Sequence, residues 1–193
     1  FPLWTPDGKL LVVGGANGLA VIDPAGTGQL QPLVRSDAIQ IPWSFSPDGH
    51  YLAYHEMSRS NGFDLWTIPV QTRGSTLIAG QPRALLQSPN FEVYPAFSPD
   101  GRWLAYMTNE PGTYEVVVQP FPDPSGGKWQ ISASGGTYPV WRRDGRELYY
   151  VKPTGELVAV SVNPEAFAVG TSTTLFRASL GPSATAGSPF DVT

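Results

Sequence analysis

A short phrase recurs four times along this chain of 193 residues, and it constrains the possible folds more than any other feature. Each copy contains a large aromatic residue, two further residues and an Asp-Gly pair, and a run of mostly apolar residues follows. The second and third copies are nearly the same, "PWSFSPDGHYLAY" and "YPAFSPDGRWLAY". The copies are 41, 52 and 44 residues apart, measured between the aspartates Asp7, Asp48, Asp100 and Asp144. The chain therefore consists of four copies of one structural unit.

The third copy shows the structure that one unit is expected to adopt. Short apolar stretches alternate with turn residues and predict four strands, at 94–97, 102–107, 114–121 and 128–132. The first turn is Ser98–Gly101, because Pro presets the backbone, Asp can hold a backbone N–H and Gly accepts a positive φ. Four antiparallel strands in a meander form one blade of a propeller, and repeats of about 40 to 50 residues are typical of such blades.

The other copies fit the same template, so the sequence predicts an all-β protein. We expect a single β-propeller segment of four-stranded antiparallel blades, with blades at roughly 1–39, 40–92, 93–137 and 138–188. The long second spacing is expected to be absorbed by a loop insertion at Gln71–Gln81. The stretch "GGANG" from Gly14 predicts a hairpin turn. No window of about 11 residues keeps a helical period, so no helix is expected.

Composition excludes several classes of protein and partner. Charged residues make up 15% of the chain and apolar residues 41%, which is not the composition of a disordered tail. The net charge is -4 and Lys and Arg form no block, so nucleic acid is not expected as a partner. No apolar run approaches the roughly 20 residues that cross a bilayer, so this segment is not expected to insert into a membrane. The absence of cysteine excludes disulfides, thiol nucleophiles and Cys-based zinc sites.

The aromatic residue that precedes each Asp-Gly turn predicts how the blades pack. A single blade cannot bury both of its faces and is stable only against neighbouring blades. We therefore expect these aromatic residues to lie between adjacent blades, where burial of each side chain stabilises the fold by roughly 1.5–3 kcal/mol. The four residues are Trp4, Phe45, Phe97 and Trp141.

No group of residues has the pattern of a catalytic or metal site. The two histidines, His50 and His55, fit structural roles next to a turn and at a strand end. Each turn aspartate stands alone, without the alternating carboxylates of a calcium loop, so it is expected to hold the turn. Glu92, Asp100 and Asp144 have no fixed separation of the kind that paired catalytic carboxylates need. We predict no catalytic residue, no metal, no cofactor and a chain that is not itself an enzyme.

The repeated phrase also carries a resemblance to a known family. "FSPDGRWLAY" with the following "YEVVVQPF" resembles the WD40-like repeat of the TolB type, often called PD40. The stretch from Val116 to Val151 resembles, more narrowly, the extracytoplasmic propellers fused to bacterial serine/threonine kinases. The resemblance implies a bacterial, periplasmic or otherwise extracytoplasmic propeller. The kinase motifs themselves are absent from this chain. Arg142 and Arg143 replace the Ser-Pro pair of the repeat, which predicts a less rigid fourth turn.

Three functions remain open on this sequence. The leading one is a non-catalytic module that senses a ligand or binds a protein, peptide or cell-envelope ligand at the axial funnel of the propeller. The starts of the first strands and the loops between blades are expected to line that funnel, and they offer residue types that anchor many interfaces. These candidate residues are Arg35, Trp43, Glu92, Tyr94 and Tyr138. The alternative is an accessory or gating propeller of a larger enzyme, either a bacterial serine/threonine kinase or a prolyl-oligopeptidase-like hydrolase. The third is an enzyme in its own right, such as a polysaccharide lyase.

The number of copies suggests that the ring continues beyond this chain. The resemblance implies a ring of about six or more blades, and four are present here. Residues 189–193 look like the first strand of a further blade. We expect either a segment of a larger ring or an arc that another chain completes, for example a second copy related by two-fold symmetry.

Overall fold

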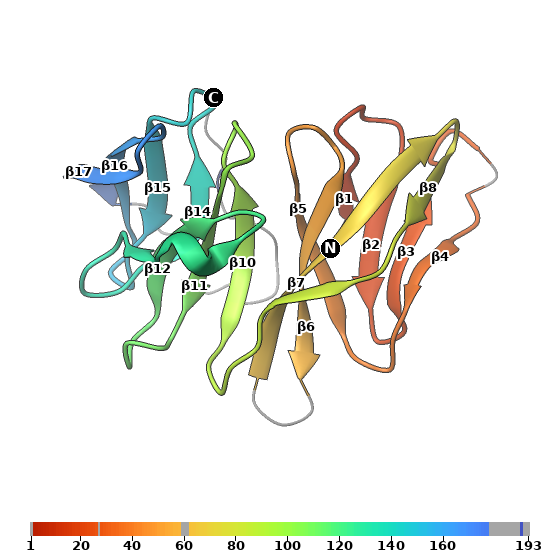
Figure 1. The fold of residues 1–193 in the computed structure, drawn as a ribbon, viewed down its shortest axis with the longest axis horizontal. Coiled ribbons are helices and arrows are strands. Elements are labelled where there is room, and N and C mark those ends of the chain that lie inside the picture. The colour runs from red at the N-terminus through yellow and green to blue at the C-terminus, as the bar shows by residue number, and fades with distance from the viewer. Residues whose placement is uncertain (1, 27, 59–61, 178–189, 191–193) are drawn as a thin grey trace. The chain divides into compact units, whose positions relative to one another are not determined.

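The computed structural model describes residues 2–26, 28–58, 62–177 and 190. In these residues the structure is all-β, and its one helical element is the 3-10 turn η1 at Pro124–Gly126. The strands form four antiparallel sheets that follow one another along the chain (Figure 1). This confirms the predicted fold class, and we number the sheets blade 1 to blade 4 in chain order. The further strand expected at 189–193 lies outside the described residues, apart from Phe190.

The chain divides into two compact units, residues 1–93 and 94–193. The first unit holds blades 1 and 2, whose strands pair in the order given. Blade 1 consists of β1 (Pro2–Trp4), β2 (Leu11–Gly15), β3 (Gly18–Ile22) and β4 (Gln31–Arg35). Blade 2 consists of β5 (Gln40–Phe45), β6 (Tyr51–Ser58), β7 (Gly62–Arg73) and β9 (Arg83–Leu86). The hairpin predicted at "GGANG" is confirmed, since β2 and β3 pair on either side of a two-residue turn.

A second hairpin in blade 2 replaces the loop that was predicted at Gln71–Gln81. Strand β7 continues to Arg73, and the chain turns and returns as β8 (Thr76–Ala79), paired with β7. Gly74 at the turn has a φ of +59°, which glycine adopts at little cost. Leu77 of β8 is 4% exposed and joins the core of the first unit. The insertion is ordered as strands because pairing satisfies its backbone and because Leu77 gains burial.

Blades 1 and 2 share one hydrophobic core. Val12 and Val21 are paired across β2 and β3, and they pack with Leu52 and Ile68, which are paired across β6 and β7. Alternate residues of each strand enter this core because successive side chains on a strand point to opposite faces. The rest of the buried cluster consists of Leu10, Leu19, Tyr54, Val70 and Leu77.

The second unit holds blades 3 and 4, which are built in the same way. Strand β10 (Glu92–Phe97) begins two residues before the start of this unit. The other strands of blade 3 are β11 (Trp103–Thr108), β12 (Glu115–Pro120) and β13 (Trp129–Gln130). Blade 4 consists of β14 (Thr137–Trp141), β15 (Glu147–Val151), β16 (Glu156–Asn163) and β17 (Ala168–Arg177).

Aromatic rings hold blades 3 and 4 together. Phe167, between β16 and β17, is 3% exposed. Its ring centroid lies 4.7 Å from that of Trp103 and 5.0 Å from that of Trp129, both on blade 3. Trp141 of blade 4 donates its indole N–H to the carbonyl oxygen of Ala96 on blade 3 at 3.1 Å. The two blades therefore pack through large apolar surfaces, and a polar group that is buried there is satisfied across the boundary.

The four Asp-Gly corners have the same geometry. In each corner the glycine has a φ of 68–72° and donates its N–H to the carbonyl three residues earlier at 2.8–2.9 Å. One carboxylate oxygen of the aspartate accepts from the backbone N–H two residues later at 3.0–3.2 Å. The same oxygen accepts from the side chain two residues earlier at 2.5–2.8 Å. Those donors are Thr5, Ser46, Ser98 and Arg142. The turn-holding role predicted for the aspartates is confirmed.

The aromatic residues at the corners differ in burial, and one prediction is wrong. Phe45 packs against the shared core of blades 1 and 2, and Trp141 is 7% exposed in the core of blades 3 and 4. Phe97 is also 7% exposed and meets Phe121 edge to face. Trp4, by contrast, is 52% exposed. Phe45 and Trp141 each pack on the preceding blade.

Candidate ligand-binding site

Two tyrosines occupy equivalent positions on the first strands of blades 3 and 4. Tyr94 lies three residues before Phe97, Tyr138 lies three residues before Trp141, and a proline follows each tyrosine. Both tyrosines have a left-handed backbone, with φ of 59° and 56°. In β14 the pairing with β15 is irregular at this point, as at a β-bulge. A left-handed conformation costs a non-glycine residue roughly 1–2 kcal/mol, so the fold holds these two side chains in place against strain.

The two tyrosine rings are in contact. Their centroids are 4.6 Å apart and the ring planes are inclined by 31°. Both side chains are half-buried. Burial raises the pKa of the Tyr94 hydroxyl, and so do the side-chain hydrogen bond with Tyr138 and the nearby Tyr114. Tyr114 is 43% exposed. We call Tyr94, Tyr114 and Tyr138 the tyrosine cluster, a group of aromatic surfaces with hydroxyl groups at their tips.

A buried carboxylate fixes the linker between β13 and β14, residues 131–136, which leads into the strand that carries Tyr138. Glu115, the first residue of β12, is 3% exposed. Its carboxylate accepts hydrogen bonds from the hydroxyl of Ser132 and from the N–H of Gly135 at 2.9 Å. The N–H of Gly136 donates to the carbonyl oxygen of Tyr114 at 2.8 Å. The end of blade 3 is therefore fastened to the start of β12, and the position of Tyr138 beside Tyr94 follows from this attachment.

The linker also requires its two glycines. Gly135 has a φ of +99°, and a Cβ atom there would lie 2.6 Å from the side chain of Pro153. A Cβ atom on Gly136 would lie 2.5 Å from the side chain of Ser132. No larger residue fits at either position without displacing a neighbour. The path of the chain into Tyr138 is thus set by sterics as well as by hydrogen bonds.

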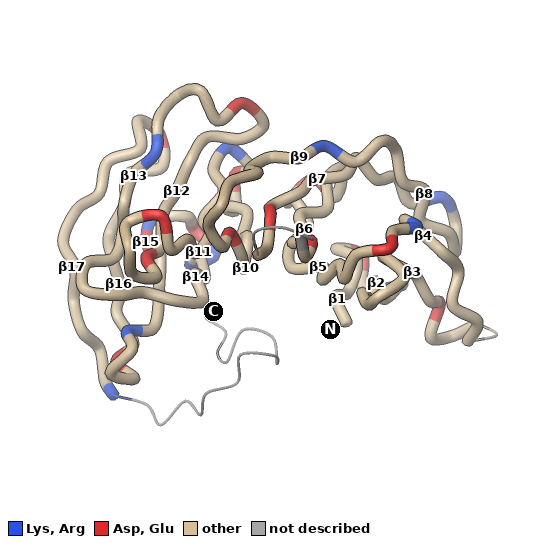
Figure 2. Tube along the Cα trace, turned by 90° about the horizontal axis from the view of Figure 1, so that it is seen from below, with Lys and Arg blue, Asp and Glu red and all other residues tan. Residues whose placement is uncertain are grey.

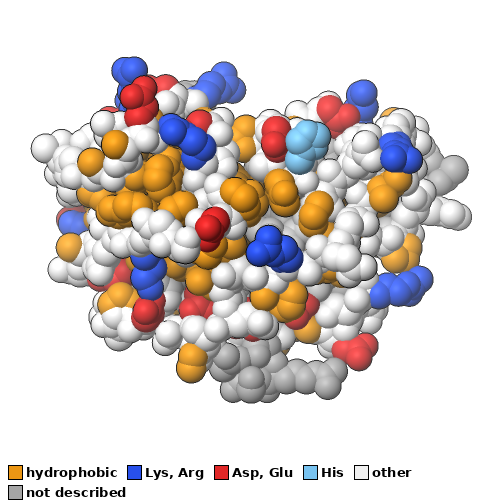
Figure 3. Space-filling model, in the orientation of Figure 1, with side chains coloured by type: hydrophobic (Ala, Val, Ile, Leu, Met, Phe, Trp, Pro, Cys, Tyr) orange, Lys and Arg blue, Asp and Glu red, His pale blue; other side chains and the backbone are white. Residues whose placement is uncertain are grey.

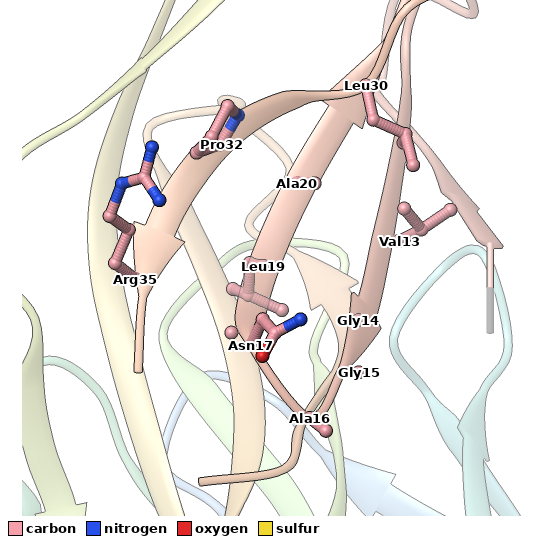
Figure 4. A pocket seen from close by; sticks show the side chains of 11 residues that line it. Val13, Gly14, Gly15, Ala16, Asn17, Leu19, Ala20, Leu30, Pro32 and Arg35 are labelled. Atoms are coloured by element: carbon pink, nitrogen blue, oxygen red, sulfur yellow. The ribbon is translucent and has the colours of Figure 1, made fainter. Parts of the chain in front are cut away.

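The predicted residue Arg35 lies elsewhere, at the end of β4 in the first unit. It lines a hollow of about 370 Å³ in blade 1. Figure 4 shows its guanidinium group on the opposite side of this hollow from Leu30 and Val13. Leu19 and Ala20 of β3 also line the hollow. The surroundings of Arg35 are therefore mainly apolar.

Trp43 and Glu92 are both engaged with side chains of the first unit. The indole N–H of Trp43 donates to Nδ1 of His55 at 2.8 Å. His55 is 3% exposed, and burial lowers its pKa to about 3, so its ring is neutral and can accept this bond. Glu92 is 4% exposed and its carboxylate accepts from the hydroxyl of Ser88 at 2.5 Å. Their use in partner binding stays a prediction. The sequence analysis missed Tyr114. Its aromatic side chain and its place directly before β12 are the signals that could have identified it.

The charged residues in the described part of the chain are mixed in sign. Acidic and basic residues are interspersed along the trace in Figure 2, and charged side chains of both signs are dispersed over the face in Figure 3. Among the described residues, no three His, Cys, Asp or Glu side chains come together in a way that could hold a metal ion. No helix within them has the length and apolarity needed to cross a bilayer.

Several solved structures of other proteins share the fold. TolB from Acinetobacter baumannii matches 93% of this chain with a TM-score of 0.71 and 19% identity. The fold is that of a TolB-type β-propeller. An oligogalacturonate lyase from Vibrio parahaemolyticus matches 89% of the chain, with a TM-score of 0.63 and 15% identity. A puromycin-hydrolysing peptidase from Mycobacterium tuberculosis matches 87%, with a TM-score of 0.58 and 14% identity.

These neighbours share architecture and differ in activity. The match takes up 43% of the TolB chain, 52% of the lyase and 30% of the peptidase, so the present chain spans less than two thirds of each. No protein-family model matches the chain. No curated protein sequence matches it either. Because one propeller fold serves both TolB and enzymes, function has to be argued from the site.

Proposed function

We propose that this chain is the recognition part of an extracytoplasmic, TolB-type propeller of bacterial origin, and that it binds a protein or peptide partner without catalysing a reaction. The observation that carries the proposal is the contact between Tyr94 and Tyr138, both held at positive φ on equivalent strands. Backbone strain of this kind is concentrated at functional sites, where the surrounding structure compensates for it. The extracytoplasmic location is supported by the resemblance to TolB-type repeats.

The chemistry of the tyrosine cluster suits a polypeptide partner. Tyrosine presents a large, rigid ring with few rotatable bonds, so little conformational entropy is lost on binding. Its ring contacts apolar side chains and its hydroxyl exchanges hydrogen bonds with a peptide backbone. Tyrosine is also enriched among the residues that contribute most to protein interfaces. Tyr114 is exposed enough to meet a partner in the free protein.

A second association is part of the same proposal. Trp4 is exposed on blade 1, at the position where Phe45 and Trp141 are covered by a preceding blade. We propose that another blade covers Trp4, supplied by the rest of a longer protein or by a second copy of this chain. Sedimentation of this chain as a compact 20.8 kDa monomer at all concentrations would contradict completion by a second copy.

The test uses variants of the tyrosine cluster that do not compromise folding. Tyr138→Gly removes left-handed strain of roughly 1–2 kcal/mol and loses a ring contact of about 0.5–1.5 kcal/mol, so stability should change little. A partner captured from a bacterial envelope extract should bind this variant at least about 30-fold more weakly, as expected for an interface anchor. Tyr149→Ala, a half-buried tyrosine that donates to Glu147, is the matched control and should bind normally. Unchanged affinity of Tyr138→Gly would contradict the proposal.

The second candidate is an accessory propeller of a larger enzyme. It is favoured by the match to the peptidase, in which this fold takes up 30% of the chain. In that case the tyrosine cluster would contact another domain of the same polypeptide. The coding sequence on either side of this segment decides between the two candidates, since a kinase or hydrolase domain next to it would favour the second.

A further inference from the structure

Three polar side chains form a row across blade 2, in the first unit. Gln40 is directly opposite Glu56 in the pairing of β5 with β6, and Glu56 is directly opposite Asp64 in the pairing of β6 with β7. Residues directly opposite one another share a face of the sheet, with Cβ atoms about 4.5–5.5 Å apart. The three side chains therefore lie side by side at one end of the blade, where β5 and β7 begin.

The row contains buried oxygen atoms that nothing in the described part of the chain satisfies. Gln40 is 2% exposed and Asp64 is 6% exposed. The amide nitrogen of Gln40 donates to one oxygen of Glu56 at 2.5 Å, which places the whole amide group against that carboxylate. The amide oxygen of Gln40 and Oδ1 of Asp64 are both buried and accept no hydrogen bond there. Burying an unsatisfied polar oxygen costs roughly 1–3 kcal/mol. We therefore expect these two atoms to have a partner that the described residues do not supply.

The two carboxylates also face each other without a compensating charge. Burial raises the pKa of Asp64, and the negative charge of Glu56 acts in the same direction. The side chain of Gln87 and the backbone of Ser88 oppose this shift with hydrogen bonds to Asp64. Within the described residues, no Lys or Arg forms an ion pair with Glu56 or Asp64. Like charges directly opposite each other on a sheet destabilise it.

The equivalent positions in blade 4 show what is missing from blade 2. Lys152 lies eight residues after Asp144, as Glu56 lies eight residues after Asp48, so Lys152 takes the place of Glu56. Glu156 lies at the start of β16 and corresponds to Asp64 near the start of β7. Lys152 and Glu156 form an ion pair of 3.6 Å. Blade 4 thus supplies its own cation to the acid at the start of its third strand. Blade 2 has a carboxylate in place of that lysine.

We propose that the row of Gln40, Glu56 and Asp64 binds a divalent cation of the calcium type. All three ligands are oxygen atoms, two from carboxylates and one from an amide, which is the donor set that Ca²⁺ prefers. The ion gives the buried oxygens of Gln40 and Asp64 a partner and removes the repulsion between Glu56 and Asp64. Glu56 is only half-buried, so the ion is reached from solvent beside it and water completes its coordination.

The test measures Ca²⁺ binding to the purified chain by calorimetry, with thermal melting in Ca²⁺ and in chelator. We expect one saturable site with a dissociation constant of about 10⁻⁴–10⁻³ M, the range of sites with few charged ligands in extracellular modules. Asp64→Asn should weaken binding at least about tenfold. Glu56→Lys, which copies blade 4, should abolish binding and raise the melting temperature in chelator. Glu156→Gln, the equivalent acid of blade 4, should bind Ca²⁺ normally.

Three outcomes would overturn the proposal. The first is the absence of saturable binding up to several millimolar Ca²⁺. The second is equal affinity of the wild type and Asp64→Asn. The third is a melting temperature that rises as the pH falls from 7 to 5 and does not respond to Ca²⁺, because that result would mean that Glu56 and Asp64 share a proton. None of these results depends on the partner of the tyrosine cluster, so this proposal and the proposed function can fail separately.

Discussion

The corners of blades 3 and 4 have the same backbone and different side-chain supports. Gly101 and Gly145 have φ of 72° and 71°, and each donates its N–H to the carbonyl three residues earlier at 2.9 Å. In blade 3 the buried hydroxyl of Ser98 donates to Asp100. In blade 4 the guanidinium of Arg142 donates to both oxygens of Asp144. The lower rigidity predicted for the fourth turn stays a prediction, since the static geometry is the same.

The comparison separates what the corner requires from what it tolerates. Both corners keep an aspartate that accepts the N–H two residues later and a glycine at positive φ. The residue two positions before the aspartate can be a serine or an arginine, provided that its side chain donates a hydrogen bond to the aspartate. Neighbouring corners also meet, since a Cβ atom on Gly145 would lie 3.7 Å from Pro99. The turn is therefore a structural part that repeats, and its side-chain chemistry varies at the two positions before the aspartate.

The largest effect should come from the aromatic residue at the corner, where burial differs between blades. Trp141→Ala should lower the free energy of unfolding by about 3–5 kcal/mol, because a buried indole is lost. In the monomeric chain Trp4→Ala removes an exposed ring and should cost less than about 1 kcal/mol. Urea titration of both variants measures the difference. Equal losses would show that Trp4 is covered in solution.

The next effect concerns the donor to the aspartate. Ser98 is 1% exposed, and its hydroxyl also accepts the N–H of Trp103 at 3.0 Å. Ser98→Ala leaves buried polar groups without this partner and should cost roughly 1–3 kcal/mol. Arg142→Ala acts on an exposed ion pair and should cost less. The comparison fails if denaturant unfolding shows that Arg142→Ala lowers the free energy of unfolding more than Ser98→Ala does.

The glycines should respond alike, because the two backbones are the same. Gly101→Ala and Gly145→Ala each place a Cβ atom at a φ near 70°, and each should cost roughly 1–2 kcal/mol. Melting temperatures of the two variants should fall by similar amounts. A clear inequality would mean that one corner relaxes and the other does not.

The smallest effect is a change in the titration of Asp144. The side-chain hydrogen bond from Arg142 lowers the pKa of Asp144 to about 2, and the N–H of Arg146 adds to this. The folded pKa lies below the usual value of 3.8. This corner therefore stabilises the fold above about pH 4, and the contribution is lost as the pH falls through the folded pKa. In Arg142→Ala the pKa should move up toward 3.8, which NMR titration can follow, while the pKa of Asp100 stays unchanged.

Much of the fold could be predicted because repeated local sequence patterns determine its strands and turns. The spacing of the four aspartates and the alternation of apolar residues were sufficient to predict the blades and their corners. The hairpin at Thr76–Ala79 was missed, although Gly74 marks its turn. Its order depends on the burial of Leu77 against blades 1 and 2, which local sequence does not reveal. The exposure of Trp4 depends on which blade covers it, and this too is a tertiary property.

The candidate site could be predicted only in part. Tyr94 and Tyr138 were selected by residue type and by their place on the first strands. Their positive φ was not predicted from the sequence, and at Tyr138 it coincides with an irregular pairing of β14 with β15. Glu92 was selected by its place at the start of a first strand; it is 4% exposed and its carboxylate accepts from the hydroxyl of Ser88. The row in blade 2 joins residues 24 positions apart in the chain, between Gln40 and Asp64, and it becomes visible only through the strand pairing.

The measurement that tests the central claim most directly is a carbon-detected NMR titration of the four corner aspartates, Asp7, Asp48, Asp100 and Asp144. If the four phrases are equivalent corners, the pKa of every one of them lies below the usual value of 3.8. Hydrogen bonds to the carboxylate lower the pKa of all four aspartates, and in Asp100, where burial is the largest single effect, they still outweigh it together with the charge of Arg102. Titration of any of the four at or above 3.8 in the folded chain would contradict the account, because that corner would then not be the same structural unit as the others.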